Sequence, residues 1–410
     1  MKHRYGYLGV ALVLAFALFA QGLSGASARS TQATKLKGTV HIALITSLSG
    51  AFSVYGNMEW QGFDIGLKYA TNGKMKVDNA KIVVKKYDDA SGAGNNPDPT
   101  LATQLATNAI TNDHADILQC CASSGSAAAV AAVAAKYKKI LMVAPAAADT
   151  LAGINRYTFR TSRESMQDAI TGSKYAVQKF GKTYMTIAQN YSFGTDGIKA
   201  WSGVLNKLGA TDEGDVLFPL TATDFTPYIQ QIIAKHPKFV IPICAGTQCV
   251  TLFKQMNDSG LLDQVKVMTG LGNITSWPSF GDSATKIGFI AIYYYKFPKT
   301  KANTYLVKQM QKTYHRVPDI FDQDSFAAAQ QIVAALKKTH SLSSSKLIKA
   351  LEGQTVQGPK GPYTIRKSDH VALQPMYIAA LTGSGTNLKA KLIATRSAKQ
   401  TTPPVQTVNW

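Results

Sequence analysis

Residues 118–127, LQCCASSGSA, place two of the four cysteines of the chain beside three serines. Thiols can bind a metal or exchange disulfides, and a serine at a strand-to-helix turn can attack a substrate or bind an anion. No Cys-x-x-Cys motif and no histidine pair accompanies the cysteines, so we expect no metal. Residues 122–126 lack the flanking glycines of a GxSxG elbow and no suitably placed histidine follows, so we expect no catalytic residue and no enzyme.

The two adjacent serines can bind an anion instead. Ser123 and Ser124 directly precede a helix that we expect to begin near Gly125. The free N–H groups and the positive dipole end of a helix favour an anion, and a hydroxyl can donate one more hydrogen bond. The alternative is that one serine only caps the helix. The sequence leaves both interpretations open.

The remaining cysteines and glycines point to no cofactor. Cys244 and Cys249 lie five residues apart across an expected strand-to-helix turn, where a local disulfide is feasible. A disulfide between the neighbours Cys120 and Cys121 would be strained. Residues 270–275 give only GxGxxT, and the chain has no P-loop motif, so we expect no nucleotide cofactor.

The N-terminal residues and the net charge of the chain indicate where the protein acts and what it binds. Residues 1–28 contain basic residues, an apolar run and a final Ala-Ser-Ala, which is the order of a secretory signal peptide, and a polar leader follows at 29–38. We therefore predict export to the periplasm or another extracytoplasmic space. The net charge is +20, but the lysines are scattered, and export argues against a nucleic-acid partner.

Short β-branched runs alternate with longer helical patterns along the chain. The expected strands are 40–46, 81–88, 115–119, 139–144, 184–189, 215–220, 239–244, 265–270 and 287–295. Strands separated by helices of this length indicate right-handed βαβ units and parallel sheets. The two series predict an α/β protein with two doubly wound lobes and a cleft at the carboxyl ends of both sheets.

Three helical patterns follow the second series and need a place in the fold. The simplest solution returns the chain to the first lobe near Tyr295 and crosses back near residues 358–363. The predicted division is lobe 1 at 39–159 plus 296–360, lobe 2 at 160–295 plus 361–385, and a C-terminal tail at 386–410.

Several motifs, in one order, carry a family resemblance. They include LITSLSGAFSVYGNMEWQGFDIGLKYA, YDDASGAGNNPDPTLA, ASSGSAAAVAAVAA, YTFRTSRESMQDA, NYSFGTDGIKA and KGPYTIRKSDHVALQPMYIA. Over residues 39–382 the chain resembles the leucine/isoleucine/valine-type periplasmic substrate-binding proteins of branched-chain amino acid ABC transporters. The resemblance implies a Venus-flytrap fold of the type I periplasmic class, with three crossovers. It also implies a monomer that delivers a small molecule to a membrane permease of the branched-chain amino acid type, without chemistry.

The resemblance also implies ligand-contacting residues. Ser124 matches the serine that binds the ligand carboxylate, with Ser123 as the alternative in register. The other matching positions are the backbone of Ala146 and Ala147, Tyr55 in the first lobe, and Phe193 with its neighbour Tyr191 in the second lobe. For Tyr55 and Phe193 the alternative is ordinary packing at a turn.

One departure bears on the ligand. The family's amino-acid binders pair the ligand ammonium with an acid in the loop after the strand at 265–270, but here residues 271–274 are Leu-Gly-Asn-Ile, so Asn273 is the polar candidate. A buried ammonium without a carboxylate costs several kcal/mol. Arg163, after the first crossover, is either a charge partner for an anion or a surface residue.

We therefore expect a solute-binding protein for a small carboxylate, either an aromatic or an organic acid, or for an amide. The alternatives are a branched-chain amino acid binder, a sensory ligand-binding module and, least in accord with the motifs, a hydrolase.

Overall fold

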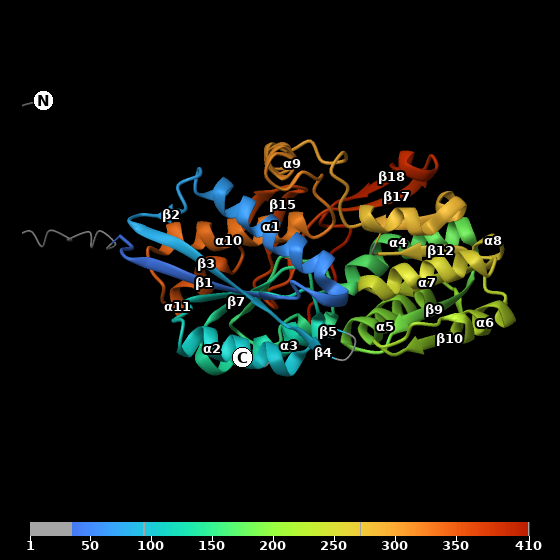
Figure 1. Ribbon diagram of the computed structural model, residues 1–410, viewed down its shortest axis with the longest axis horizontal. Helices are drawn as coiled ribbons and strands as arrows, with labels where there is room; N and C mark the ends of the chain where they lie inside the picture. Colours follow the sequence, from blue (N-terminus) through green and yellow to red (C-terminus); the bar gives the residue numbers. More distant parts are fainter. Residues whose placement is uncertain (1–34, 93–94, 271, 409) are drawn as a thin grey trace, which may run out of the picture. The chain divides into compact units, whose positions relative to one another are not determined.

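A computed structural model describes residues 35–92, 95–270, 272–408 and 410 (Figure 1). The predicted signal peptide at 1–28 and most of the polar leader lie outside the described residues. Within the described ranges, no helix is both long enough and apolar enough to cross a bilayer.

The first sheet has the strand order β2-β3-β1-β6-β7-β8. All neighbours pair in parallel except β2, which is antiparallel to β3. The strands are β1 Thr39–Thr46, β2 Lys76–Val77, β3 Ala80–Asp88, β6 Ile117–Cys120, β7 Ile140–Val143 and β8 Thr158–Arg160. Strands β6 and β7 are buried at every position, as expected for parallel strands covered on both faces.

Helices cover both faces of this sheet. One face packs against α1 Ser53–Ala70, α10 Asp322–Thr339 and α11 Ser344–Leu351. The other face packs against α2 Pro99–Thr111 and α3 Ser124–Tyr137. Helices α1 and α10 approach closely at Gly62 and Gly66, where a Cβ would lie 2.2 and 2.7 Å from backbone atoms of Asp322 and Phe326. Glycine at these two positions therefore permits the contact.

The second sheet has the order β10-β9-β11-β12-β13-β17-β18, parallel through β13 and antiparallel thereafter. Its strands are β9 Thr183–Gln189, β10 Thr211–Phe218, β11 Phe239–Ile243, β12 Lys266–Thr269, β13 Ile287–Ala291, β17 Met376–Thr382 and β18 Lys389–Arg396. Helices α4 Ser165–Phe180 and α5 Ser192–Lys207 pack on one face. The other face packs against α6 Thr226–Lys235, α7 Gly246–Asp258, α8 Leu261–Gln264 and the 3-10 segment η3 Ile274–Lys286.

The remaining elements connect the two lobes or lie at their edges. They are η1 Gly50–Phe52, β4 Ala90–Gly92, β5 Asn96–Pro97, η2 Asp149–Leu151, α9 Lys301–Tyr314, β14 Thr355–Gly358, β15 Gly361–Ile365, β16 Ala372–Leu373 and η4 Gly385–Asn387. Strands β14, β15 and β16 form a separate antiparallel sheet beside α10. The chain leaves the first lobe after β8, returns to it after β13, where α10 and α11 pack on the first sheet, and enters the second sheet again at β17.

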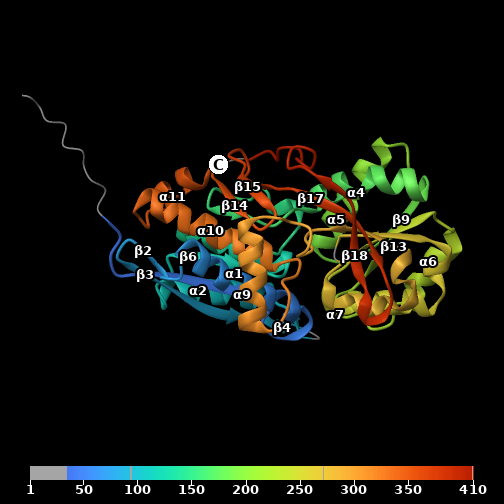
Figure 2. The same ribbon diagram turned by 90° about the horizontal axis from the view of Figure 1, so that it is seen from above.

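The predicted lobe boundaries stay a prediction, to which the pairing adds two facts. Strand β15, which we assigned to lobe 2, pairs with β14 next to α10. The predicted tail at 386–410 contains β18, which pairs with β17 in the second sheet. Its end then lies against the first lobe (Figure 2), and there Trp410 Nε1 donates to Gly153 O at 2.9 Å.

Candidate functional site

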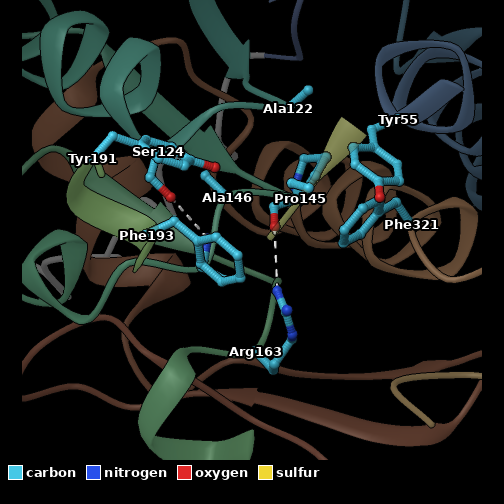
Figure 3. Close-up of a pocket in the computed structure, with 11 residues that line it drawn as sticks. Tyr55, Ala122, Ser124, Pro145, Ala146, Arg163, Tyr191, Phe193 and Phe321 are labelled. Atoms are coloured by element: carbon cyan, nitrogen blue, oxygen red, sulfur yellow. Dashed lines mark hydrogen bonds between the residues drawn. The ribbon is translucent and has the colours of Figure 1, made fainter. Parts of the chain in front are cut away.

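A small cavity lies between the carboxyl ends of the two sheets (Figure 3). Residues of both lobes line it: Tyr55, Ala122, Ser124, Pro145, Ala146, Ala147, Arg163, Tyr191, Phe193, Ala245 and Phe321. The first lobe contributes the ends of β6 and β7, and the second lobe contributes the starts of α5 and α7. This is the place where doubly wound sheets bind ligands.

Hydrogen bonds join the two sides of the cleft. The carboxylate of Asp196, in α5, accepts from the N–H and the hydroxyl of Thr150 at 2.9 and 2.8 Å. The carboxylate of Asp319 in turn accepts from the N–H of Ile274 in η3 at 2.8 Å. These contacts close the cleft around the cavity.

Ser124 is the first residue of α3, and its hydroxyl is oriented by backbone groups. Its Oγ accepts from the N–H of Ala147 at 3.3 Å and from the N–H of Ala148 at 3.1 Å. Both bonds use oxygen lone pairs, so neither uses the hydroxyl hydrogen. The side chain is 2% exposed. Ser124 can therefore donate one hydrogen bond to an acceptor in the cavity, beside the first N–H groups of the helix.

The loop that orients Ser124 is itself held by side chains from the first crossover. Arg160 donates to the carbonyls of Ala146 and Ala148 at 3.1 and 2.8 Å. Ser165 donates to the carbonyl of Ala147 at 3.2 Å. The N–H of Ala146 is bonded to the carbonyl of Cys121 at 3.1 Å. Because protein partners use these backbone groups, the alanines contribute methyl groups to the cavity wall.

Arg163 brings a positive charge to the cavity. The residue is buried, and its Nη2 lies 3.2 Å from Asp168 Oδ2 in an ion pair. Its Nη1 lies 3.5 Å from the carbonyl oxygen of Pro145, at the limit of a hydrogen bond. In the described part of the chain, Nε and Nη2 have no acceptor in hydrogen-bonding geometry. A buried guanidinium with unused N–H groups is suited to bind a carboxylate.

Aromatic rings from both lobes form the rest of the wall. Tyr55 and Phe321 meet edge to face with ring centroids 5.0 Å apart, and Tyr191 and Phe193 have centroids 6.1 Å apart (Figure 3). Burial raises the pKa of Tyr55 to about 12, so its hydroxyl stays protonated and can donate a hydrogen bond. The walls therefore suit a flat or apolar ligand body.

The structure brings most of the predicted contact residues together. Ser124, Ala146, Ala147, Tyr55, Phe193, Tyr191 and Arg163 line the cavity, with Arg163 buried rather than on the surface. Ser123 and Asn273 do not line it. Ser123 is the N-cap of α3 and makes no side-chain capping bond, and the amide of Asn273 donates to Thr275 Oγ1.

Sequence reasoning missed four lining residues. Ala122, Pro145 and Ala245 are small or apolar neighbours of the strand ends, with no chemical signature of their own. Phe321 lies just before α10, almost two hundred residues after Ser124, and only the fold brings it to Tyr55.

The cysteines lie beside the site rather than in it. Cys244 and Cys249 form a disulfide with an S–S distance of 2.00 Å across the turn into α7. Cys120 and Cys121 form one between neighbours, at the end of β6. All four are buried, and none lines the cavity. Within the described residues, no group of three or more His, Cys, Asp or Glu side chains could hold a metal ion.

The comparisons with known proteins agree with this geometry. The chain is 26% identical over 348 residues to a Leu/Ile/Val-binding protein of Citrobacter freundii, covering 82% of this chain and 90% of the relative. It is 33% identical to an ABC-type branched-chain amino acid transporter protein from Rhodopseudomonas palustris CGA009, whose crystal structure covers 90% of this chain and 100% of its own, with a TM-score of 0.73.

A third solved structure shares the fold. It is a solute-binding protein of an ABC transporter from Rhodopseudomonas palustris BisB5, in complex with 3,4-dihydroxybenzoic acid, with a TM-score of 0.80, 22% identity and coverage of 88% and 98% of the two chains. Residues 39–386 match the family described as periplasmic binding protein. Two doubly wound lobes around a closed cleft, together with this match, show that the chain belongs to the periplasmic binding protein family, the solute-binding components of ABC transporters.

Proposed function

We propose that this protein captures a small carboxylate with an apolar, preferably aromatic, body and delivers it to an ABC permease. The observation that carries the proposal is the charge of the cavity wall. Arg163 and the donor hydroxyl of Ser124 face the cavity, and none of its described lining residues is acidic. An anion gains hydrogen bonds from the guanidinium and the hydroxyl in such a site, whereas an ammonium meets a guanidinium.

Size does not separate the candidates, because benzoate and leucine are both small molecules. The charge of the cavity wall does separate them, since Arg163 is the one charged residue among the described lining residues.

The relatives support both a main and a second candidate. Solved structures with the same fold were obtained with 4-hydroxybenzoate and with benzoate. The relatives named Leu/Ile/Val-binding proteins favour a branched-chain amino acid as the second candidate. That candidate needs a partner for the ligand ammonium, which the described lining residues lack. We therefore place the carboxylate first.

Membership of the periplasmic binding protein family also supports a proposal for where the protein acts and what it contacts. We propose that residues 1–28 direct export, that the protein acts in the periplasm or an equivalent space, and that its partner is a permease of the branched-chain amino acid type. No chemical step is needed for this role, because closure of the cleft around the ligand is the signal that the permease reads.

A thermal-shift screen tests the ligand class. A ligand that binds only the folded state raises the melting temperature by mass action. We expect benzoate and hydroxybenzoates to raise it more than leucine, valine or neutral benzamide at equal concentration. A rise with leucine or valine, and none with any carboxylate that lacks an amine, would make the protein an amino-acid binder.

A further inference from the structure

Arg163 belongs to a cluster of four buried charges where the chain passes between the lobes. Asp168 lies in the first turn of α4, Asp324 in the first turn of α10, and Lys360 in the turn between β14 and β15. None of the four residues is more exposed than Lys360, at 5%. Buried charges at this density are rare unless they are paired.

Asp324 is the least satisfied member of the cluster. In the described part of the structure, neither of its carboxylate oxygens has a hydrogen-bond donor in normal geometry. The cations that act on it are Lys360 and Arg163. The Nζ of Lys360 donates to the carbonyl of Ile292 at 3.0 Å and contacts Met376 Sδ at 3.8 Å, and it has no hydrogen bond to Asp324 in normal geometry. An ionised carboxylate in this position therefore depends chiefly on charge balance.

The neutral groups around Asp324 compensate its charge only in part. The side-chain amide of Gln323 lowers the pKa of Asp324, but it also donates to the carbonyl of Ile320 at 3.0 Å. Tyr363, on β15, donates its hydroxyl to Gln323 Oε1. Helix α1 faces this end of α10 with Gly62 and Gly66. Asp168 adds a second negative charge, which also acts on Asp324. The charges that decide the state of Asp324 are therefore those of Arg163, Lys360 and Asp168.

The net charge of the four side chains is zero without a ligand, but it is negative when a ligand carboxylate is bound. With all four groups ionised, two positive charges face two negative charges. A ligand carboxylate at Arg163 adds a third negative charge inside a site that excludes water. An uncompensated buried charge is costly, and a carboxyl group removes it by taking a proton.

We infer that Asp324 takes up one proton from solvent as a ligand carboxylate binds at Arg163, so that the protein captures a monocarboxylate together with a proton and discriminates against dicarboxylates. The inference rests on the proposed function. The direction of the pKa values agrees with it. Burial raises the pKa of Asp324 to about 7 and that of Asp168 to about 6, and it lowers that of Lys360 to about 8. The negative charge of a ligand raises the pKa of Asp324 further.

Calorimetric titration of the wild-type protein with benzoate, at pH 7.5 in phosphate and in Tris, measures the proton directly. These buffers differ in ionisation enthalpy, so the difference in heat gives the number of protons taken up. We expect between about 0.5 and 0.8 proton per benzoate, because Asp324 with a pKa of about 7 is already partly protonated at pH 7.5, and an apparent Kd that rises by up to about tenfold per pH unit above pH 7. Phthalate, with a second carboxylate, is expected to bind more weakly than benzoate.

Asp324→Asn is the matched variant, because it keeps the size and removes the proton. It is expected to bind benzoate with a Kd that no longer depends on the buffer pH and with no proton uptake. Benzoate binding to the wild type with no proton uptake would overturn this inference alone. Uptake that persists in Asp324→Asn would overturn the assignment to this residue. No binding of benzoate at any pH between 5.5 and 8.5 would refute the proposed function itself, and the inference with it.

Discussion

Removing the hydroxyl of Ser124 gives a prediction whose size follows from its contacts. In Ser124→Ala, the ligand carboxylate loses one donor, and a hydrogen bond to a charged group contributes about 1.5–3 kcal/mol. At about 1.4 kcal/mol per tenfold change, the Kd for benzoate rises about 10- to 150-fold. The variant also removes the acceptor of the Ala147 and Ala148 N–H groups. Buried donors without acceptors cost about 1–3 kcal/mol of folding free energy.

Calorimetric titration with benzoate measures the first effect, and urea unfolding without ligand measures the second. Ser123→Ala is the matched control, because the Ser123 side chain makes no capping bond and does not line the cavity. We expect its Kd to stay within about twofold of the wild type, since no donor to the cavity is lost. Equal losses in the two variants, or an unchanged Kd in Ser124→Ala, would refute the assignment of the donor to Ser124.

Three further predictions concern charge, pH and the disulfide. Arg163→Gln is expected to weaken benzoate binding by about 2–5 kcal/mol, whereas Arg163→Lys, which keeps the charge, loses less; titration of both checks this, and equal affinities would contradict it. Burial raises the pKa of Glu59 to about 8, so the folded state keeps a proton that the unfolded state loses. That group therefore removes about 1.4 kcal/mol of stability per pH unit as pH rises from 4.5 to 8. Glu59→Gln should show a flatter dependence of urea unfolding on pH, and an unchanged slope would argue against it. Replacing Cys244 and Cys249 by serine should lower the unfolding free energy by about 2 kcal/mol, measured in urea, because the bond closes only a short loop; no loss would show that the bond contributes nothing.

Much of the fold could be predicted because its signals are local. Strand β1 and helix α1 follow from an apolar run, a small-residue turn and a helical pattern. The start of α3 follows from the Ser-Ser-Gly sequence after an apolar strand. Strand β8 and helix α4 were missed. Strand β8 has only three residues, and the buried face of α4 includes polar residues such as Gln167, Asp168 and Thr171, which the sequence alone does not mark as buried.

Residues of the candidate site could be predicted only where they lie next to an apolar strand pattern or a small-residue turn in the sequence. Ser124 and Ala146 lie within five residues of the ends of predicted strands, and both line the cavity. Phe321 and Asp324 carry no local signal, because their positions depend on how α10 packs against α1 and the first sheet. The hydrogen bonds from Arg160 to the carbonyls of the loop after β7 could not be predicted either. Nothing in the sequence around Arg160 indicates that its guanidinium lies against that loop. Long-range packing is what the sequence patterns leave open.

We propose that the cleft recognises a carboxylate and that none of its described lining residues is an acid that could pair with an ammonium. Calorimetric titration with 4-methylpentanoate and with leucine tests it most directly, because the two ligands differ only in the α-amino group. We expect 4-methylpentanoate to bind at least about tenfold more tightly than leucine, since a buried ammonium without a partner costs several kcal/mol. Tighter binding of leucine would contradict it.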